Sequence, residues 1–149
     1  MQYFEDLIVG DVTDCGSVTV TGEEIIAFAE QFDPQPFHVD EEAAAESIFG
    51  GLVASGWHTA ALTMQRIVAS IQDQAFAGAR GVDELRWHRP LRPGTTLSVE
   101  TELLRKDPEG GRPGIGHVDF ETRGYDDDGE LLISWVSRSL MYKRPTEDV

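Results

Sequence analysis

The sequence predicts an α+β fold in which helices come first and an antiparallel sheet follows. Between Thr21 and Gln74, apolar residues recur at spacings of three and four, as on one face of a helix. Beyond Gly81 they alternate with polar residues, as in strands with one buried face. Helices followed by strands, without βαβ alternation, are typical of α+β proteins. We expect residues 1–149 to form a single domain with its own core.

The first predicted helix begins at a capping box and ends at a proline. Thr21 is the expected N-cap, and Glu24 stands three residues later, where its side chain can reach back to the Thr21 N–H. Pro34 ends the helix, because the residue before a proline is pushed out of the α region. Asp33 is therefore expected at the helix exit, with its side chain pointing into a cleft.

Two further helices are expected before the sheet. Asp40 is the expected N-cap of a short helix over residues 41–46. The central and longest helix begins at Ser55 or Gly56 and runs to about Gln74. Much of its opposite face is also small or apolar, which predicts that other structure wraps it. Its apolar residues recur at spacings of three and four: Ala60, Met64, Ile67, Val68 and Ile71.

Alternating segments predict the strands. A short strand is expected at residues 17–20, and longer ones at residues 96–103 and 118–123. Residues 131–142 are apolar on both faces in places, as expected of a strand inside a sheet. After the central helix we expect an antiparallel meander of about four strands, with the helix packed on one face.

Composition excludes several functional classes. The formal net charge of −15 argues against nucleic-acid binding and against adsorption to anionic membranes. No apolar run is long enough to span a bilayer, and acidic residues stand where a signal peptide would carry basic ones. We therefore expect a soluble, cytoplasmic protein. Cys15 is the only cysteine, which excludes an intramolecular disulfide and a cysteine-rich zinc site.

An acid and a histidine, Asp33 and His38, lie close together in a stretch that Pro34 and Pro36 are expected to hold extended. Histidine changes its charge near neutral pH, and a neighbouring carboxylate can share in proton transfer. The N–H of Gly56, at the positive end of the central helix, is a suitable donor to a developing oxyanion. Together these groups predict an active site for acid–base chemistry.

The same stretch resembles the MaoC-like acyl dehydratase family. The similarity is strongest in two segments, FDPQPFHVD at residues 32–40 and FGGLVASGWHTA at residues 49–60. The segment RPLRPG at residues 89–94 resembles the turn that precedes a long strand in the family. The family's hydratase motif is Asp-x-Asn-Pro-x-His, and Asp33, Pro36 and His38 of the first segment fall on it.

The resemblance implies a hot dog fold, an antiparallel β-sheet wrapped around a long central α-helix. It implies an acyl-thioester hydratase or dehydratase that interconverts enoyl-CoA and 3-hydroxyacyl-CoA, with Asp33 and His38 as the acid–base pair and Gly56 as the oxyanion donor. It also implies a coenzyme A thioester as substrate, no metal or other cofactor, a role in fatty acid metabolism, and a homodimer or higher homo-oligomer. We expect substrate contacts from Gln35, Phe49, Ser55, Trp57, His58, Arg86 and Arg89.

Several alternatives stay open. For His58 a packed or capping role is the alternative to substrate contact. For the arginines between residues 80 and 92, one interpretation is a seat for coenzyme A phosphates, and the other is a strand end paired with nearby acids. Strand alternation places Arg86 and His88 on one face, and Trp87 and Arg89 on the other.

Departures from the family pattern limit the functional prediction. The (R)-specific hydratases tend to carry a serine two turns into the central helix, and here that place is apolar or taken by Thr63 nearby. Gln35 stands where the motif usually has Asn, and Ser55 stands where (R)-specific enoyl-CoA hydratases usually have a His. A hot dog acyl-CoA thioesterase would need a carboxylate on or facing the central helix, and residues 59–70 contain none. A non-catalytic acyl-CoA-binding or partner subunit is the other alternative. His38 and Asp40 predict no metal site, because no third ligand with suitable spacing accompanies them.

Overall fold

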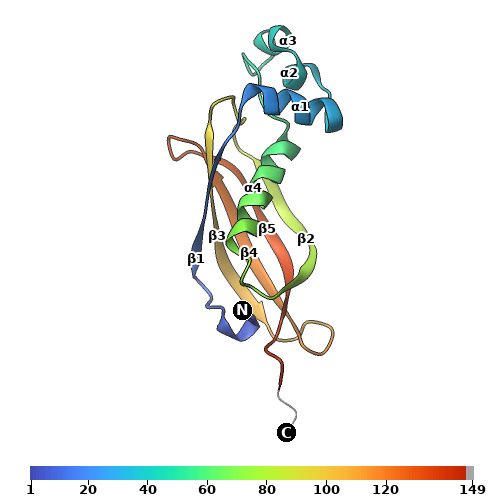
Figure 1. The fold of residues 1–149 in the computed structure, drawn as a ribbon, viewed down its shortest axis with the longest axis vertical. Coiled ribbons are helices and arrows are strands. Elements are labelled where there is room, and N and C mark those ends of the chain that lie inside the picture. The colour runs from blue at the N-terminus through green and yellow to red at the C-terminus, as the bar shows by residue number, and fades with distance from the viewer. Residues whose placement is uncertain (147–149) are drawn as a thin grey trace.

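The computed structural model describes residues 1–146 and contains a five-stranded antiparallel sheet (Figure 1). The spatial order of the strands is β1-β3-β4-β5-β2. The strands are β1 (Val12–Thr19), β2 (Phe76–Trp87), β3 (Thr96–Asp107), β4 (Ile115–Tyr125) and β5 (Leu131–Tyr142). β5 lies between β4 and β2, as its apolar sequence predicts. With the helices described below, the sheet confirms the α+β class.

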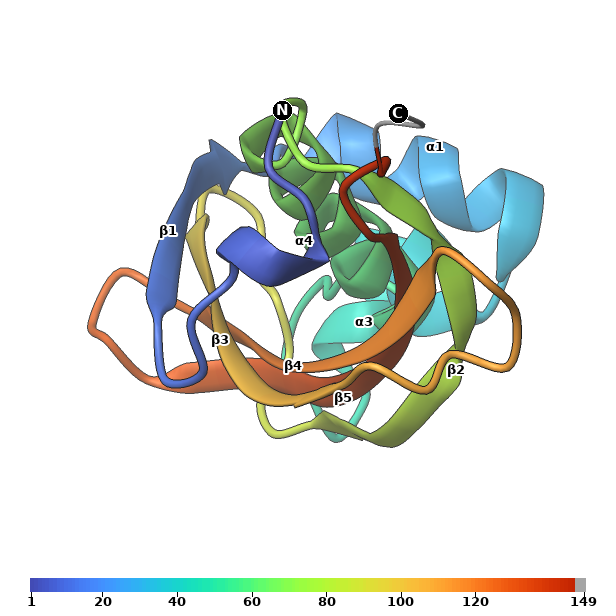
Figure 2. The ribbon, with the colours of Figure 1, turned by 90° about the horizontal axis from the view of Figure 1, so that it is seen from below.

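The sheet curves around helix α4 (Gly56–Ser70), which lies in its hollow (Figure 2). This arrangement confirms the predicted hot dog fold. The helix ends at Ser70 rather than near Gln74, because Ile71 leaves the helical conformation and a turn closed by the Gln74 N–H and the Ile71 carbonyl follows. Neither α4 nor any other helix in residues 1–146 has the length and apolar character needed to cross a membrane.

Three short helices close one end of the sheet, beyond the N-terminus of α4 (Figure 1). They are α1 (Gly22–Phe32), α2 (Pro36–Val39) and α3 (Glu41–Ala45). The predicted capping box of α1 is present, with the Glu24 N–H donating to Thr21 Oγ1 and the Thr21 N–H donating to Glu24 Oε1, both at 3.2 Å. Asp33 follows as the C-cap of α1, as predicted.

The segment after Asp33 differs from its expected extended form. Residues 36–39 make one helical turn, α2, with Pro36 at its first position. The prediction was wrong because proline has no N–H to lose there and its fixed φ already suits a helix start. Asp40 caps α3 as predicted, since its Oδ1 accepts hydrogen bonds from the N–H groups of Glu42 at 2.9 Å and Ala43 at 3.2 Å.

The expected meander of four consecutive strands is also corrected. Only β3, β4 and β5 are consecutive neighbours, whereas β2 lies at the far edge beside β5, and β1 pairs with β3 at the other edge. β2 begins at Phe76, well before Gly81. Its register shifts in three places, and Gly78 and Gly81 both have positive φ. These irregularities hide the alternation that would mark a strand in the sequence.

The core consists of two clusters of buried apolar residues, which we call the upper and the lower cluster. The upper cluster joins α1 to β3, β5 and the loops between the elements, with Val20, Ile25, Leu52, Leu91, Leu97 and Leu132 among its buried members. The lower cluster consists of Phe4, Leu103, Val118 and Met141. Phe4 belongs to the short 3₁₀ helix η1 (Phe4–Asp6), and its ring occupies the space where a side chain at residue 116 would lie. Glycine at that position therefore lets the N-terminal segment seal the lower end of the sheet.

The capping box generates a stability prediction. Thr21→Ala should lower the free energy of unfolding by about 1 kcal/mol, because it removes the acceptor for an N–H group at the start of α1. Urea denaturation measures the change. Ser17→Ala is a matched control, since Ser17 is exposed on β1 and its hydroxyl makes no hydrogen bond within residues 1–146. Equal stabilities of the two variants would contradict the capping role.

Candidate active site

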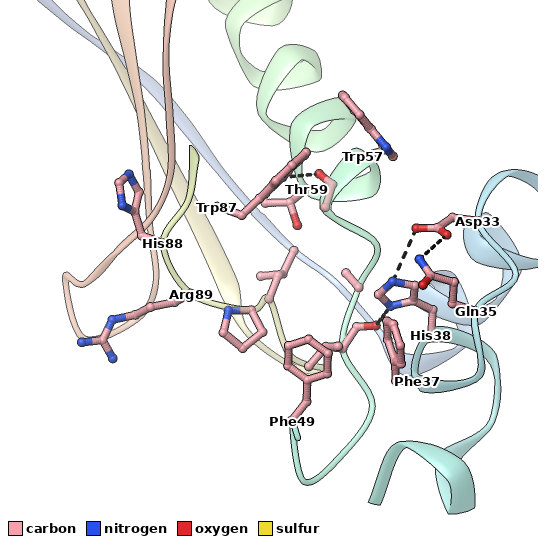
Figure 3. Close-up of a pocket in the computed structure, with 15 residues that line it drawn as sticks. Asp33, Gln35, Phe37, His38, Phe49, Trp57, Thr59, Trp87, His88 and Arg89 are labelled. Carbon is pink, nitrogen blue, oxygen red and sulfur yellow. Dashed lines mark hydrogen bonds and ion pairs between the residues drawn. The ribbon is translucent and has the colours of Figure 1, made fainter. Parts of the chain in front are cut away.

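A cavity of about 500 Å³ lies between the N-terminus of α4, the α1–α3 helices and the end of β2 (Figure 3). Asp33 and His38 line it from the side of α1 and α2. Aromatic side chains form much of its remaining wall: Phe37, Phe49, Trp57 and Trp87. The cavity thus combines an acid and a histidine with walls suited to an apolar group.

His38 is held by one ring nitrogen and presents the other. Its side chain is buried, and Nδ1 lies 2.7 Å from the Val53 carbonyl oxygen. A carbonyl only accepts hydrogen bonds, so Nδ1 carries a proton and donates it to this bond. Nε2 is then directed toward Asp33, with 3.4 Å between Nε2 and Oδ2 (Figure 3). The backbone of residue 53 therefore fixes both the orientation and the tautomer of the imidazole.

Both carboxylate oxygens of Asp33 accept hydrogen bonds. Ser55 Oγ donates to Oδ2 at 2.7 Å, and Gln35 Nε2 donates to Oδ1 at 2.7 Å. Burial raises the pKa of Asp33, but the hydrogen bonds from Ser55 and Gln35 outweigh it, with a smaller effect from His38 when its ring is protonated. The pKa of Asp33 consequently lies below its ordinary value, and the group is ionised at neutral pH.

The N-terminus of α4 leaves one N–H group available at the cavity. The Trp57 N–H donates to Ser55 Oγ at 3.2 Å, and the N–H groups of His58 and Thr59 donate to the Ser55 carbonyl oxygen at 2.9 and 3.1 Å. The Gly56 N–H has no acceptor among residues 1–146, and Gly56 lines the cavity. This N–H, at the positive end of the helix, is available to an oxygen atom of a ligand.

The indole of Trp87 covers Gly56. Trp87 Nε1 donates to the Gly56 carbonyl oxygen at 2.7 Å, and the indole meets Trp57 edge to face with 5.1 Å between ring centroids. A Cβ atom on Gly56 would lie 2.5 Å from Cε2 of the indole. Glycine was expected here to let a substrate approach the backbone, and the structure adds a second reason, the close packing of Trp87.

The expected substrate-contact residues divide into two groups. Gln35, Phe49, Trp57 and Arg89 line the cavity. Ser55, His58 and Arg86 do not, and each has a physical reason. Ser55 is fully buried and binds Asp33, so it reaches the site only through that carboxylate. Arg86 precedes Trp87 in β2, where neighbouring side chains point to opposite faces of the sheet.

The expected alternation fails after Trp87. β2 ends there, and Trp87, His88 and Arg89 all line the cavity, although alternation separated His88 from the other two. Alternation applies only to residues in a regular strand, and the chain turns toward Pro90 immediately after this one.

His58 takes the packed role that was the alternative to substrate contact. Its ring stacks on Phe28, with 4.4 Å between centroids and 6° between planes. Burial lowers the pKa of His58, against a smaller opposing effect of the Glu24 charge. Its Nδ1 has no hydrogen-bond partner in the described part of the chain. A neutral ring therefore suits this position better than a charged one.

Few groups here could hold an ion. Within residues 1–146 no group of three or more His, Cys, Asp or Glu side chains is arranged to bind a metal. Arg89 lines the cavity and could bind an anionic group of a ligand. Its Nη2 lies 3.4 Å from Oε2 of Glu130. Arg92 donates to the Phe49 carbonyl oxygen at 2.8 Å and so braces the opposite wall.

Sequence reasoning missed the Val53 carbonyl, the position of Trp87 and the part that Thr59 plays in the wall. A main-chain acceptor leaves no trace in residue types, so nothing in the sequence pointed to Val53. Gly56 at the first position of a helix was a signal for the close approach of another group. It could not show that the approaching group is Trp87, which is 31 residues away.

The chain also matches a known protein family over most of its length. The family described as "MaoC like domain" matches residues 8–116, which is most of the chain. The chain belongs to this MaoC-like family. The family assignment confirms the resemblance of the two motif segments to the MaoC-like dehydratase family.

Three individual proteins are similar to this MaoC-like chain over most of its length. The MaoC-like dehydratase from Rhodospirillum rubrum has a crystal structure with a TM-score of 0.90 and 43% identity, covering 98% of this chain and 100% of that one. Uncharacterized protein YdeM of Bacillus subtilis is 32% identical over 87% of this chain and 95% of that protein. The 3-hydroxybutyryl-CoA dehydratase of Methylorubrum extorquens is 31% identical over 72% of this chain and 67% of that protein.

The packing of Trp87 on Gly56 can be tested by stability. Gly56→Ala should lower the free energy of unfolding by about 1–3 kcal/mol, because the new methyl group meets an indole fixed by its own hydrogen bond. In a Trp87→Leu background the same change should cost much less, and urea denaturation of the four proteins measures the coupling. An equal loss in both backgrounds would show that Trp87 is not the obstacle.

The lowered pKa of His58 predicts a pH dependence of stability. Its folded pKa lies below the ordinary value of about 6.5, so the unfolded chain takes up the proton first as the pH falls. The stability that neutral His58 contributes is complete above about pH 6.5 and declines below it, toward the folded pKa, at up to about 1.4 kcal/mol per pH unit.

His58→Phe keeps the stack on Phe28 and should remove this part of the decline. Unfolding free energies at about pH 7.5 and about pH 5.5 measure it. His117→Gln, a histidine change outside α4, should leave the decline as in the wild type. Equal losses of stability in the wild type and in His58→Phe between these pH values would contradict a neutral His58 in the folded protein.

Proposed function

We propose that the chain is an acyl-thioester hydratase or dehydratase, which adds water to a 2-enoyl thioester and removes it from the 3-hydroxyacyl form. Asp33 and His38 act as its acid–base pair, and the Gly56 N–H stabilises the enolate oxygen. One observation carries the proposal. His38 Nε2 and Asp33 Oδ2 lie 3.4 Å apart in a cavity that the free N–H end of α4 also lines.

The proposed hydration begins with a water molecule in the cavity that contacts both Asp33 and His38. Asp33 accepts a hydrogen bond from the water and orients it, while the unprotonated Nε2 of His38 takes its other proton as the oxygen bonds to C3 of the substrate. Geometry supports this order, because the bond from Nδ1 to the Val53 carbonyl leaves Nε2 as the free nitrogen. General acid–base catalysis of this kind typically contributes about 10²–10⁴-fold to a rate.

The electrons of the C2–C3 double bond move onto the thioester oxygen as water adds. The Gly56 N–H is the proposed donor to that oxygen, where a helix N-terminus favours negative charge. The enolate then collapses, and C2 takes the proton from Nε2 of His38. Water has been added across the double bond, and both side chains are back in their starting states. Dehydration follows the same steps in reverse.

The proposed substrate is a coenzyme A thioester, with no metal or other cofactor. Support comes from the curated relative, which is named for a 3-hydroxybutyryl-CoA substrate. Phe49 and Trp57 would pack against the acyl group, and Arg89 is the proposed contact for an anionic part of the carrier.

We also propose that the protein is a homodimer. Met64 and Val68 of α4 and Val82 of β2 are exposed apolar side chains around a groove of about 290 Å³. A second copy that covered this apolar face would remove it from water.

The site assignment is tested with a panel of enoyl-CoA substrates, following the loss of the conjugated thioester absorbance. Asp33→Asn and His38→Ala should each lower kcat/KM by about 10²–10⁴-fold. Asp40→Asn is the matched control, because it removes a neighbouring carboxylate and asparagine still caps a helix well. Its rate should stay near that of the wild type.

Three outcomes would count against this function. Wild-type rates in both site variants would overturn the residue assignment. Release of free thiol without loss of the double bond would point to a thioesterase. Binding of the whole panel without turnover would mark a non-catalytic acyl-CoA-binding subunit.

A further inference from the structure

We propose that Ser55 and Gln35 are positioning residues that keep Asp33 a carboxylate throughout the reaction, so that His38 alone carries the proton. The inference deepens the proposed function and rests on it for the roles of Asp33 and His38. Both residues depart from the family pattern. Both bind the same carboxylate, one at each oxygen.

Ser55 links Asp33 to the helix inside the sheet. Its side chain is fully buried, and its hydroxyl accepts the Trp57 N–H at 3.2 Å while donating to Asp33 Oδ2 at 2.7 Å. A hydroxyl that accepts one hydrogen bond becomes a better donor in the next. The positive end of α4 thus acts on Asp33 through Ser55, and it favours the ionised form.

Gln35 completes the arrangement from the other side. Its Nε2 donates to Asp33 Oδ1 at 2.7 Å, from a side chain at the cavity wall. The local structure brings the two residues together, since Asp33 ends α1, Gln35 precedes α2, and the Gln35 N–H also donates to the Asp33 carbonyl oxygen at 2.8 Å. Each carboxylate oxygen therefore has a neutral donor, and protonation of either would break a short hydrogen bond.

His38 is the titratable group directed at Asp33 from the packed elements. On α4, His58 is turned toward Phe28 instead. Across the cavity, His88 Nε2 lies 2.8 Å from Ser134 Oγ, and Arg89 lies 3.4 Å from Glu130. A proton released in the cavity therefore has His38 Nε2 as its acceptor, because Asp33 is held ionised and Nδ1 is engaged with Val53.

The consequence is a division of labour between the pair. In hydration, Nε2 gains the proton of water when the C3–O bond forms, and it loses that proton to C2 when the enolate collapses. Asp33 keeps its charge at every step, orients the water and stabilises the transient imidazolium. No proton needs to be shared between two groups of similar affinity.

The test follows the side-chain carboxyl of Asp33 by ¹³C NMR as the pH is lowered. Wild-type Asp33 should stay ionised below about pH 3.9, the ordinary midpoint of aspartate. Gln35→Met, which keeps the length of the side chain and removes the donor, should move the midpoint upward. Gln35→Glu should move it further, because it also adds a like charge.

Ser55→Ala should also raise the midpoint, and Ser70→Ala serves as its control. Ser70 is on the same helix, and its hydroxyl bonds the Ile67 carbonyl far from the cavity. Ser55→Ala also removes the cap of α4, so the Gln35 variants keep the test decisive if it folds poorly. Gln35 is exposed and caps no helix through its side chain.

Activity gives a second, separate readout. In Gln35→Met, kcat on an accepted enoyl-CoA should fall by up to about 100-fold through loss of alignment, with KM near the wild-type value. In Gln35→Glu, kcat/KM should be lost at a higher pH than in the wild type as acid is added. The Ser70→Ala enzyme should match the wild type in both measurements.

The outcomes separate this inference from the proposed function. An Asp33 midpoint at or above the ordinary value in the wild type, or one unmoved in Gln35→Glu and Ser55→Ala, would overturn the positioning roles. If no thioester is turned over but the midpoints move as expected, the positioning of Asp33 stands and only the proposed reaction fails.

Discussion

The hydrogen bond from Ser55 to Asp33 joins the helix inside the sheet to the helices that close its end. Ser55 caps α4, and Asp33 is the C-cap of α1, so one contact links two elements that start far apart in the sequence. Because both groups are largely withdrawn from water, the contact is stronger than it would be on the surface. Together with the stack of Phe28 on His58, this contact holds α1 against α4, and together with Gln35 it favours the ionised form of Asp33 in the cavity.

Gly56 is subject to two demands at once. Its N–H is the group left free at the start of α4, while its carbonyl is bound by the Trp87 indole. The ring also fills the space that a side chain would need. The wall of the cavity and the N–H donor are therefore built as one unit, and a change at Trp87 would alter the shape of the cavity and the environment of the donor together.

Local chemistry made much of the site predictable. The capping box at Thr21 and the proline after Asp33 act within a few residues, so the sequence placed the end of α1 correctly. Strand order depends on contacts between distant residues, and the pairing of β2 with β5 was accordingly missed. The same holds for Ser55, whose hydroxyl meets a carboxylate 22 residues away. From the sequence alone, Ser55 was expected to contact the substrate instead.

The Phe4 side chain closes the lower end of the core. Its ring is packed against apolar residues of the lower cluster, and the ammonium groups of Lys106 and Lys143 lie 4.5 and 6.0 Å from its centre. Met1 is exposed, so a peptide fused ahead of it would leave Phe4 in place. Removal of residues 1–7 would instead expose the apolar lower cluster to water, and an exposed apolar patch of this kind promotes aggregation.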